Sequence, residues 1–189
     1  MLRKITLLLV IVMLVTPSCT PSHTTTVACN VADLINAIDN ANADAILDTL
    51  ELASGCVYML TEVNTTVTDT FEESTFVYGD VGLPPISTPI TINGHNATIS
   101  RAEDAPDFRI FHITNSGRLI LNDLTITNGF ADASMEDGTS SAFPGSGGAI
   151  YNDGAFLEVN RSNLQLNMAD FHGGAIFDIN DATTYVRDS

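Results

Sequence analysis

The feature that most constrains the fold of this chain is a short motif that occurs twice, with a period of 26 residues. Gly147-Gly148-Ala149-Ile150-Tyr151-Asn152 returns as Gly173-Gly174-Ala175-Ile176-Phe177-Asp178. A looser recurrence pairs Leu119-Ile120-Leu121-Asn122 with Leu157-Glu158-Val159-Asn160. Recurrence at such spacing is typical of architectures in which each repeat stacks on the preceding one. We therefore expect stacked turns of chain, with Ile150 lying against Ile176 and both side chains pointing inward.

After Pro89 the chain consists of short runs in which apolar and polar residues alternate, separated by turn sequences. The runs are 90–92, 97–99, 109–113, 119–121, 124–126, 157–159 and 164–166. Strands this short do not build an ordinary sandwich, but they fit a coil in which each strand pairs with its equivalent one turn later. Glycine pairs permit close backbone approach at corners, and recurrent Asn side chains can hydrogen-bond along the stack.

The segment 30–42 has helical periodicity instead, because Val31, Leu34, Ile35 and Ile38 recur at the spacing of one helix face. Asn30 is a suitable N-cap residue. We expect this helix to cover the N-terminal end of the stack, since open ends of repeat folds expose apolar core. Two short strands are expected around residues 50–60, and residues 61–88 are expected to form a surface excursion.

Residues 1–18 resemble an export signal, with two cations followed by an apolar run that is short for a membrane span. Cys19 follows directly, as at a bacterial lipoprotein cleavage site, so Cys19 is the candidate for lipidation. Ordinary signal-peptidase cleavage a few residues later is the alternative. Residues 19–28 are polar and are expected to form a flexible tether.

Cys29 and Cys56 remain in the mature chain. Two cysteines in an exported protein indicate a disulfide. By closing a loop, this bond would stabilise the folded state by roughly 3 kcal/mol. Two buried free thiols are the alternative.

Charge excludes several classes of partner. The full chain has a net charge of −16, and without residues 1–18 five Arg and no Lys face 23 acids, a net charge of −18. Nucleic-acid binding needs clustered cations, which are missing, and anionic lipid head groups would be repelled. Contact with a membrane is therefore expected only through the signal or a lipid anchor.

Taken together, the motifs resemble exported bacterial proteins with right-handed parallel β-helix (pectin-lyase-like) repeats, similar to CSLREA-domain proteins and to polymorphic outer membrane proteins with GGAI repeats. The resemblance rests on both GGAI copies, the helix 30–42, Glu51 to Cys56, Leu83 to Ile86 and the strands 90–99 and 121–126. The CSLREA string itself is not present. The resemblance implies an all-β, right-handed parallel β-helix (a single-stranded solenoid) with an N-terminal capping α-helix.

The expected organisation is a signal over 1–18, a tether over 19–28, an N-terminal cap over 29–88 and β-helix turns over 89–189. The last turn breaks off at Ser189, so we expect the chain to be a fragment of a longer β-helix.

The resemblance also raises the question of polysaccharide-cleaving chemistry. Lyases of this fold use an Arg or Lys base with calcium held by carboxylates, and glycosidases use paired carboxylates. Arg109 and Arg118 lie near acids in the sequence, namely Asp104, Asp107 and Asp123, but surface charges beside turns are the simpler interpretation. His172 precedes Asp178 and Asp181 closely, without a paired-carboxylate motif.

The remaining histidines and the acidic loop are weak candidates for catalysis or metal binding. His95 lies in a turn sequence, His23 in the tether and His112 in a strand. The acidic loop 131–140 (ADASMEDGTS) is a weak calcium candidate, because it lacks the order of a dedicated calcium loop. We expect no catalytic residue, no cofactor and no other metal ligand.

Three functions stay open on sequence grounds. The first is a non-catalytic, cell-surface, adhesin-like protein, monomeric and displayed as a lipoprotein, with surface glycans or other cells as partners. The second is a fragment of a polysaccharide lyase or glycoside hydrolase whose active site lies outside this chain. The third is a secreted structural protein without a lipid anchor.

Overall fold

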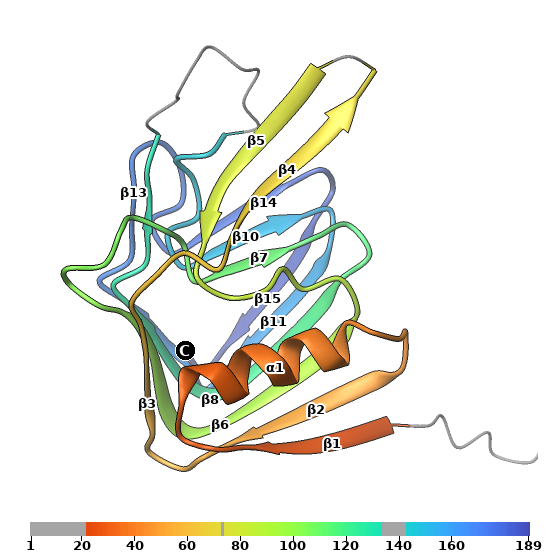
Figure 1. Cartoon of the computed structure of the whole chain (residues 1–189), viewed down its shortest axis with the longest axis vertical. Helices are drawn as coiled ribbons and strands as arrows, with labels where there is room; N and C mark the ends of the chain where they lie inside the picture. Colours follow the sequence, from red (N-terminus) through yellow and green to blue (C-terminus); the bar gives the residue numbers. More distant parts are fainter. Residues whose placement is uncertain (1–21, 73, 134–142) are drawn as a thin grey trace, which may run out of the picture.

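The computed structural model describes residues 22–72, 74–133 and 143–189 (Figure 1). The described residues are mostly β, with parallel sheets and a single helix. The elements are β1 (Ser22–Val27), α1 (Val31–Ala41), β2 (Leu47–Leu52), β3 (Val57–Leu60), β4 (Thr65–Phe71), β5 (Ser74–Val81), β6 (Pro89–Arg101), β7 (Phe111–Ile113), β8 (Arg118–Thr127), β9 (Phe130–Ala131), β10 (Ile150–Asp153), β11 (Phe156–Asn160), β12 (Asn163–Gln165), β13 (Met168–Ala169), β14 (Ile176–Ile179) and β15 (Thr183–Arg187).

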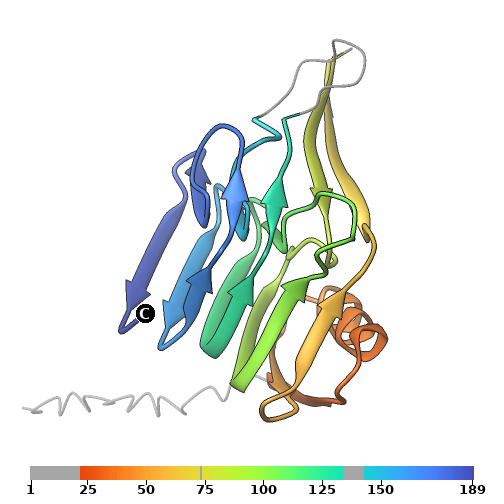
Figure 2. The same ribbon diagram turned by 90° about the vertical axis from the view of Figure 1, so that its left-hand side faces the viewer.

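The largest sheet has the order β1-β2-β6-β8-β11-β15, and every neighbouring pair in it is parallel (Figure 2). Strand β3 pairs with the second half of β6, and β12 with the second half of β8. Parallel pairing between strands far apart in sequence needs a crossover each time. From β6 onward the crossovers pass through two further parallel sheets, β14-β10-β7 and β13-β9, whereas α1 lies between β1 and β2 and the hairpin β4–β5 between β2 and β6.

The two GGAI copies lie side by side. Strand β10 pairs in parallel with β14, and Ile150 lies opposite Ile176. Ile150 is fully buried and Ile176 packs against the core from a half-buried position. The expected contact between the two isoleucines is confirmed.

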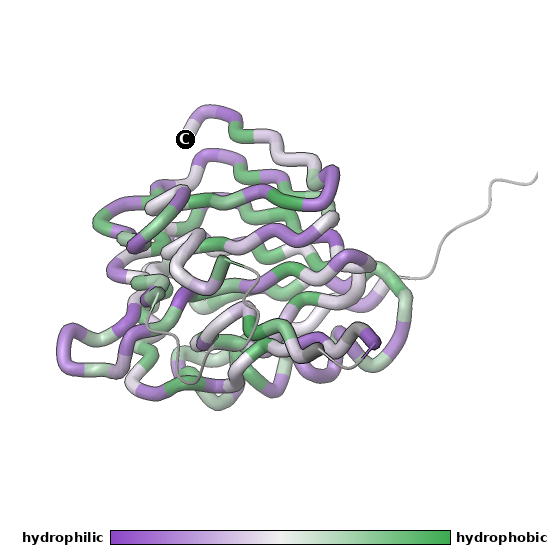
Figure 3. The backbone as a smooth tube through the Cα atoms, turned by 90° about the horizontal axis from the view of Figure 1, so that it is seen from above, coloured by the Kyte–Doolittle hydropathy of each residue, from purple (hydrophilic) through white to green (hydrophobic). Residues whose placement is uncertain are grey.

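Apolar residues form continuous inward columns across the large sheet. Ile90, Leu119 and Leu157 are in register, and all three are fully buried. Because side chains alternate along a strand, the residues between them point outward, and Figure 3 shows the resulting alternation of hydrophobic and hydrophilic residues. Each buried aliphatic side chain contributes roughly 1.5–3 kcal/mol relative to an exposed one, so these columns are the main source of stability.

A second kind of column is polar. The Asn93 amide donates to Glu51 (2.8 Å), Asn122 donates to Asn93 (2.9 Å) and Asn160 donates to Asn122 (3.0 Å). These three hydrogen bonds all point in the same direction across four strands, and the last acceptor is the Glu51 carboxylate. The His95 ring also contacts this carboxylate, at 2.7 Å. Hydrogen bonds from Asn93 and then His95 lower the pKa of Glu51. The predicted stacking of Asn side chains is confirmed.

The strands bend at residues in the left-handed conformation. His95 and Asn96 break β6 (φ 50° and 62°), Asp123 breaks β8 (φ 52°) and Arg161 separates β11 from β12 (φ 47°). The expected turn at 94–96 is thus a corner within β6, where the register with β8 shifts. Asp123 and Arg161 form a bidentate pair at 2.7 and 2.8 Å between two neighbouring corners.

Helix α1 matches its prediction. The Asn30 side chain accepts a hydrogen bond from the Asp33 N–H, and Leu34 and Ile38 are fully buried in the core. The helix lies beside β1 and β2 at one end of the stack (Figure 1). The disulfide Cys29–Cys56 fastens its start to β3, as predicted, across a separation of 27 residues. No helix among the described residues is long and apolar enough to cross a membrane.

Two sequence expectations differ from the structure. Residues 22–27 of the expected tether form strand β1, because a polar segment can pair its backbone with β2 even with five of its six residues exposed. The expected surface excursion over 61–88 contains the antiparallel hairpin β4–β5, but Leu83 and Ile86 beyond it are fully buried. Residues 1–18 and Cys19 lie outside the described residues.

The glycine pairs generate a stability prediction. A Cβ atom at Gly148 would overlap the Met168 carbonyl oxygen and lie 2.5 Å from that of Gly174, whereas one at Gly174 would meet its nearest atom, Asn167 O, at 3.0 Å. We expect Gly148→Ala to destabilise the fold by roughly 1–3 kcal/mol, as overpacking does, and Gly174→Ala to cost clearly less. Urea unfolding of both variants provides the measurement, and equal losses would contradict the stacking described for this corner.

Candidate functional site

The outer face of the β7-β10-β14 sheet carries a row of rings, which we call the aromatic column: His112, Tyr151 and Phe177. They are in register on the three parallel strands. Because Phe111 and Ile150 point into the core, the next residue of each strand points out. The His112 and Tyr151 rings stack at 5.0 Å with an angle of 6°, and Phe177 meets Tyr151 at 5.2 Å.

Other rings cover both ends of the aromatic column. Tyr78 on β5 stands edge-on to His112 at 5.4 Å and to Tyr151 at 5.8 Å. At the other end His172 stacks on Phe177 at 5.8 Å, and Phe143 approaches Phe177 at 5.9 Å. The hairpin β4–β5 therefore shields the first two rings, while the last part of the column meets solvent.

Arg109 lies beneath the hairpin and is 1% exposed. Its guanidinium donates to the carbonyl oxygens of Tyr78 (2.6 Å) and Pro144, and lies 4.8 Å from the centre of the Tyr151 ring. Burial lowers the pKa of Arg109 to about 10. The side chain ties the hairpin and the segment before the first GGAI motif to the sheet.

His112 is neutral in this setting. Burial, and then the positive charge of Arg109, lower the pKa of His112 to about 3. Its Nδ1 atom has no hydrogen-bond partner among the described residues. Burial likewise raises the pKa of Tyr151, so both rings act as uncharged stacking partners.

The structure does not bring the cations of the lyase hypothesis together. Arg109 is buried among backbone carbonyls, whereas the Arg118 guanidinium lies over the Phe156 ring at 4.1 Å. Asp107 pairs with Arg101 at 3.4 Å and Asp123 with Arg161 at 2.7 Å. Arg109 therefore lacks the access to substrate that a catalytic base requires.

The second set of catalytic candidates is also dispersed. His172 packs among rings, as described above, whereas Asp178 accepts hydrogen bonds from Asn152 (2.8 Å) and Thr184 (2.7 Å). Asp181 lies beyond β14 at a left-handed turn position. Most of the acidic loop proposed for calcium, residues 134–140, lies outside the described residues.

Large apolar side chains are exposed in the segments that precede the two GGAI motifs, and two of them, Phe143 and Phe171, contact His172. We call this set the apolar patch; it consists of Phe143, Leu166, Met168 and Phe171, which are 46–76% exposed. Leu166 and Met168 also line a groove of about 440 Å³ together with Arg101, Asp107 and Phe130. No sequence pattern predicts this surface, because its members come from a turn, a two-residue strand and a segment far away in the sequence. Exposed apolar side chains that gather on one surface mark interaction sites.

Comparisons with protein-family models, with characterised proteins and with solved structures returned no match to this chain.

The buried position of Arg109 yields a prediction about stability. Arg109→Ala removes the donors to the buried Pro144 carbonyl and the partly buried Tyr78 carbonyl, and is expected to cost about 2–5 kcal/mol of unfolding free energy. Arg118→Ala removes an equally sized side chain that stacks on one ring at the surface, and is expected to cost less than about 1 kcal/mol. Chemical denaturation of the two variants checks this, and similar small losses would show that Arg109 does not hold the hairpin.

His112 yields a pH prediction. Because its pKa is about 3 in the folded chain and 6.5 in the unfolded chain, the unfolded state binds the extra proton between these values. Stability is therefore expected to fall as the pH drops from 6.5 toward 3. In His112→Phe this loss is expected to be smaller between pH 6.5 and 4.5, where carboxylates contribute little. Thermal unfolding across that window is the measurement, with the exposed-histidine variant His95→Gln as control; parallel curves for His112→Phe and wild type would refute the assignment.

Proposed function

We propose that this chain is an exported, non-catalytic surface protein, built as a right-handed parallel β-helix with a capping helix, which serves adhesion to glycans or cells. The observation that carries the proposal is the parallel, in-register pairing of successive strands in three sheets, which the chain visits in a repeated order. Stacked architectures of this kind present long lateral surfaces for binding.

The placement of charged groups supports binding rather than catalysis. Arg109 is buried, Arg101 and Arg161 are occupied by carboxylates and carbonyls, and Arg118 rests on a ring. A lyase needs an accessible base beside a preorganised site that stabilises negative charge. The described residues hold no such arrangement, so the alternative, a fragment of a polysaccharide lyase or glycoside hydrolase, places its active site outside this chain.

The apolar patch is the surface best suited to a partner. Aromatic faces and apolar side chains contact the apolar faces of sugar rings or of another protein, and an exposed cluster gains most from being covered. The net charge of −18 without residues 1–18 repels anionic polymers. Neutral glycans on other cells or surfaces are accordingly the proposed ligands.

The binding proposal is tested with a panel of neutral and anionic glycans. We expect the chain to bind neutral glycans, and Phe171→Ala to weaken binding about tenfold or more, as at an interface hot spot. Tyr185→Ala is the matched control, because Tyr185 is similarly exposed but lies outside the patch (47% against 57%). Equal effects of the two variants, or unsaturated products from polygalacturonate with calcium, would contradict the proposal.

Export and lipidation are proposed from residues 1–19. In a bacterial host the chain with its own leader is expected to incorporate a labelled fatty acid and to be digested by protease added to intact cells. Cys19→Ser is expected to abolish labelling, whereas Cys29→Ser/Cys56→Ser is expected to retain it. Labelling that survives Cys19→Ser would contradict lipidation, and protection from protease would contradict surface display.

A further inference from the structure

One carboxylate interrupts an apolar column. Asp48 is the second residue of β2 and points inward on the same side as Leu50 and Leu52. Its in-register neighbours further along the sheet are Ile90 and Leu119, both fully buried. Asp48 itself is 5% exposed, and its Oδ2 atom has no hydrogen-bond partner among the described residues. A buried carboxylate oxygen without a partner is costly, so a compensating group is expected there.

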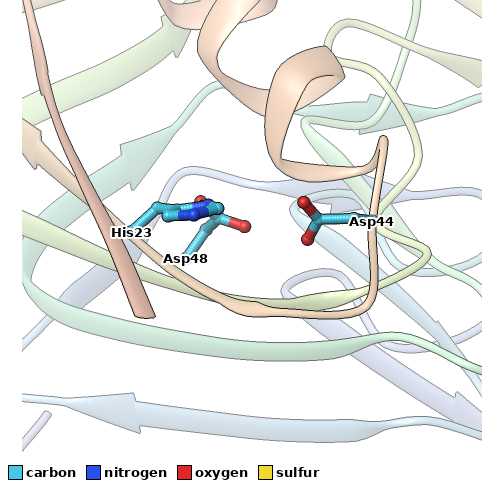
Figure 4. A group of neighbouring side chains, drawn as sticks. All are labelled: His23, Asp44 and Asp48. Atoms are coloured by element: carbon cyan, nitrogen blue, oxygen red, sulfur yellow. The ribbon is translucent and has the colours of Figure 1, made fainter. Parts of the chain in front are cut away.

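The groups around Asp48 are those that bind metal ions. His23 lies directly opposite on β1, with its Nδ1 atom 3.6 Å from the Asp48 Oδ1 atom. Asp44 comes from the turn between α1 and β2, where one of its oxygens accepts the Ile46 N–H. One ligand atom from each of the three residues lies within 4.8 Å of the others. Figure 4 shows the Asp48 carboxylate between the His23 ring and the Asp44 carboxylate.

The electrostatics of this cluster favour a cation. Two carboxylates, those of Asp44 and Asp48, share a single imidazole, that of His23, so the three groups together carry an excess of negative charge. Asp44 also lies two residues beyond the C-cap of α1, where the helix dipole is negative. A divalent ion between the two carboxylates would neutralise both and would bind the unpartnered oxygen.

We propose that His23, Asp44 and Asp48 form a site for a divalent transition metal of the zinc class. One imidazole nitrogen with two carboxylates suits zinc, whereas calcium and magnesium prefer more ligands, all of them oxygen. Tetrahedral zinc with bonds of about 2 Å places its ligand atoms roughly 3.4 Å apart, so the most distant pair of ligand atoms, which lie within 4.8 Å of each other, needs to close in by about 1.4 Å at most. Water completes the fourth position.

The site has a structural consequence that goes beyond the proposed adhesion. Strand β1 is an edge strand with one neighbour in the sheet order, and most of its residues are exposed. A metal ion held jointly by β1, β2 and the intervening turn would fasten this strand to the stack. The apolar patch and the aromatic column lie on other strands, so loss of the ion leaves those surfaces in place.

The test is calorimetric titration of Zn²⁺ into the full chain, prepared without a polyhistidine tag, together with thermal unfolding. We expect one saturable site, and a rise in the unfolding temperature of roughly 5–10 °C at a 100-fold excess over Kd. His23→Gln and Asp48→Asn are each expected to weaken Zn²⁺ binding at least tenfold. Without metal, Asp48→Asn is expected to be no less stable than wild type, because it removes a buried charge.

His95→Gln is the matched control. His95 is as exposed as His23 (side chains 51% and 56%) and contacts a carboxylate, Glu51. Among the described residues His95 belongs to no group of three ligands at metal-binding distance, so this variant is expected to bind Zn²⁺ like wild type. The proposal is overturned if wild type shows no saturable binding, or if His95→Gln weakens binding as much as His23→Gln. It is also overturned if binding survives Asp48→Asn, because the ion would then not need the Asp48 carboxylate. Should Asp48→Asn fail to fold, Asp44→Asn in the exposed turn replaces it with the same criteria.

Discussion

In-register parallel pairing is the constraint on which the rest of the structure depends. Once a strand pairs with its equivalent in the next pass, each position shares its surroundings with the same position above and below it. The column of Ile90, Leu119 and Leu157 follows from this, and so does the Asn column that ends on Glu51. The same register places His112, Tyr151 and Phe177 beside one another. In-register pairing of repeated strands thus produces the apolar core, the Asn column and the aromatic column.

The informative positions are those where a column is interrupted. Arg109 is a buried cation whose terminal nitrogens donate to two backbone carbonyls beside a ring, although its Nε atom has no hydrogen-bond partner among the described residues. Asp48 is a buried anion whose second oxygen has no comparable partner among the described residues. Buried charged groups need partners. Arg109 has partners within the chain and holds the hairpin, whereas we infer that Asp48 binds a ligand.

Sequence patterns predicted the repeated part of the fold because repetition is visible in sequence. The GGAI copies placed Ile150 against Ile176, and apolar spacing located the helix. Strand β1 was missed because its polar residues carry no alternation; its backbone pairing with β2 is a tertiary effect. The burial of Leu83, Ile86 and Arg109 could not be predicted from sequence, because it depends on how the chain packs beneath the hairpin β4–β5. The inward position of Asp48 can be predicted from sequence, because Asp48 alternates with Leu50 and Leu52. The proximity of His23 and Asp44 to Asp48 depends on the fold and cannot be predicted in this way.

The account rests on parallel stacking, and nuclear Overhauser contacts between backbone protons of neighbouring strands test it most directly. Leu157 is expected to show contacts to Leu119 on one side and Thr184 on the other, and Ile150 to Phe111 and Ile176. All these pairs are distant in sequence and arise only from parallel register. Antiparallel contacts between β10 and β11, or between β14 and β15, as in hairpins, would contradict the account.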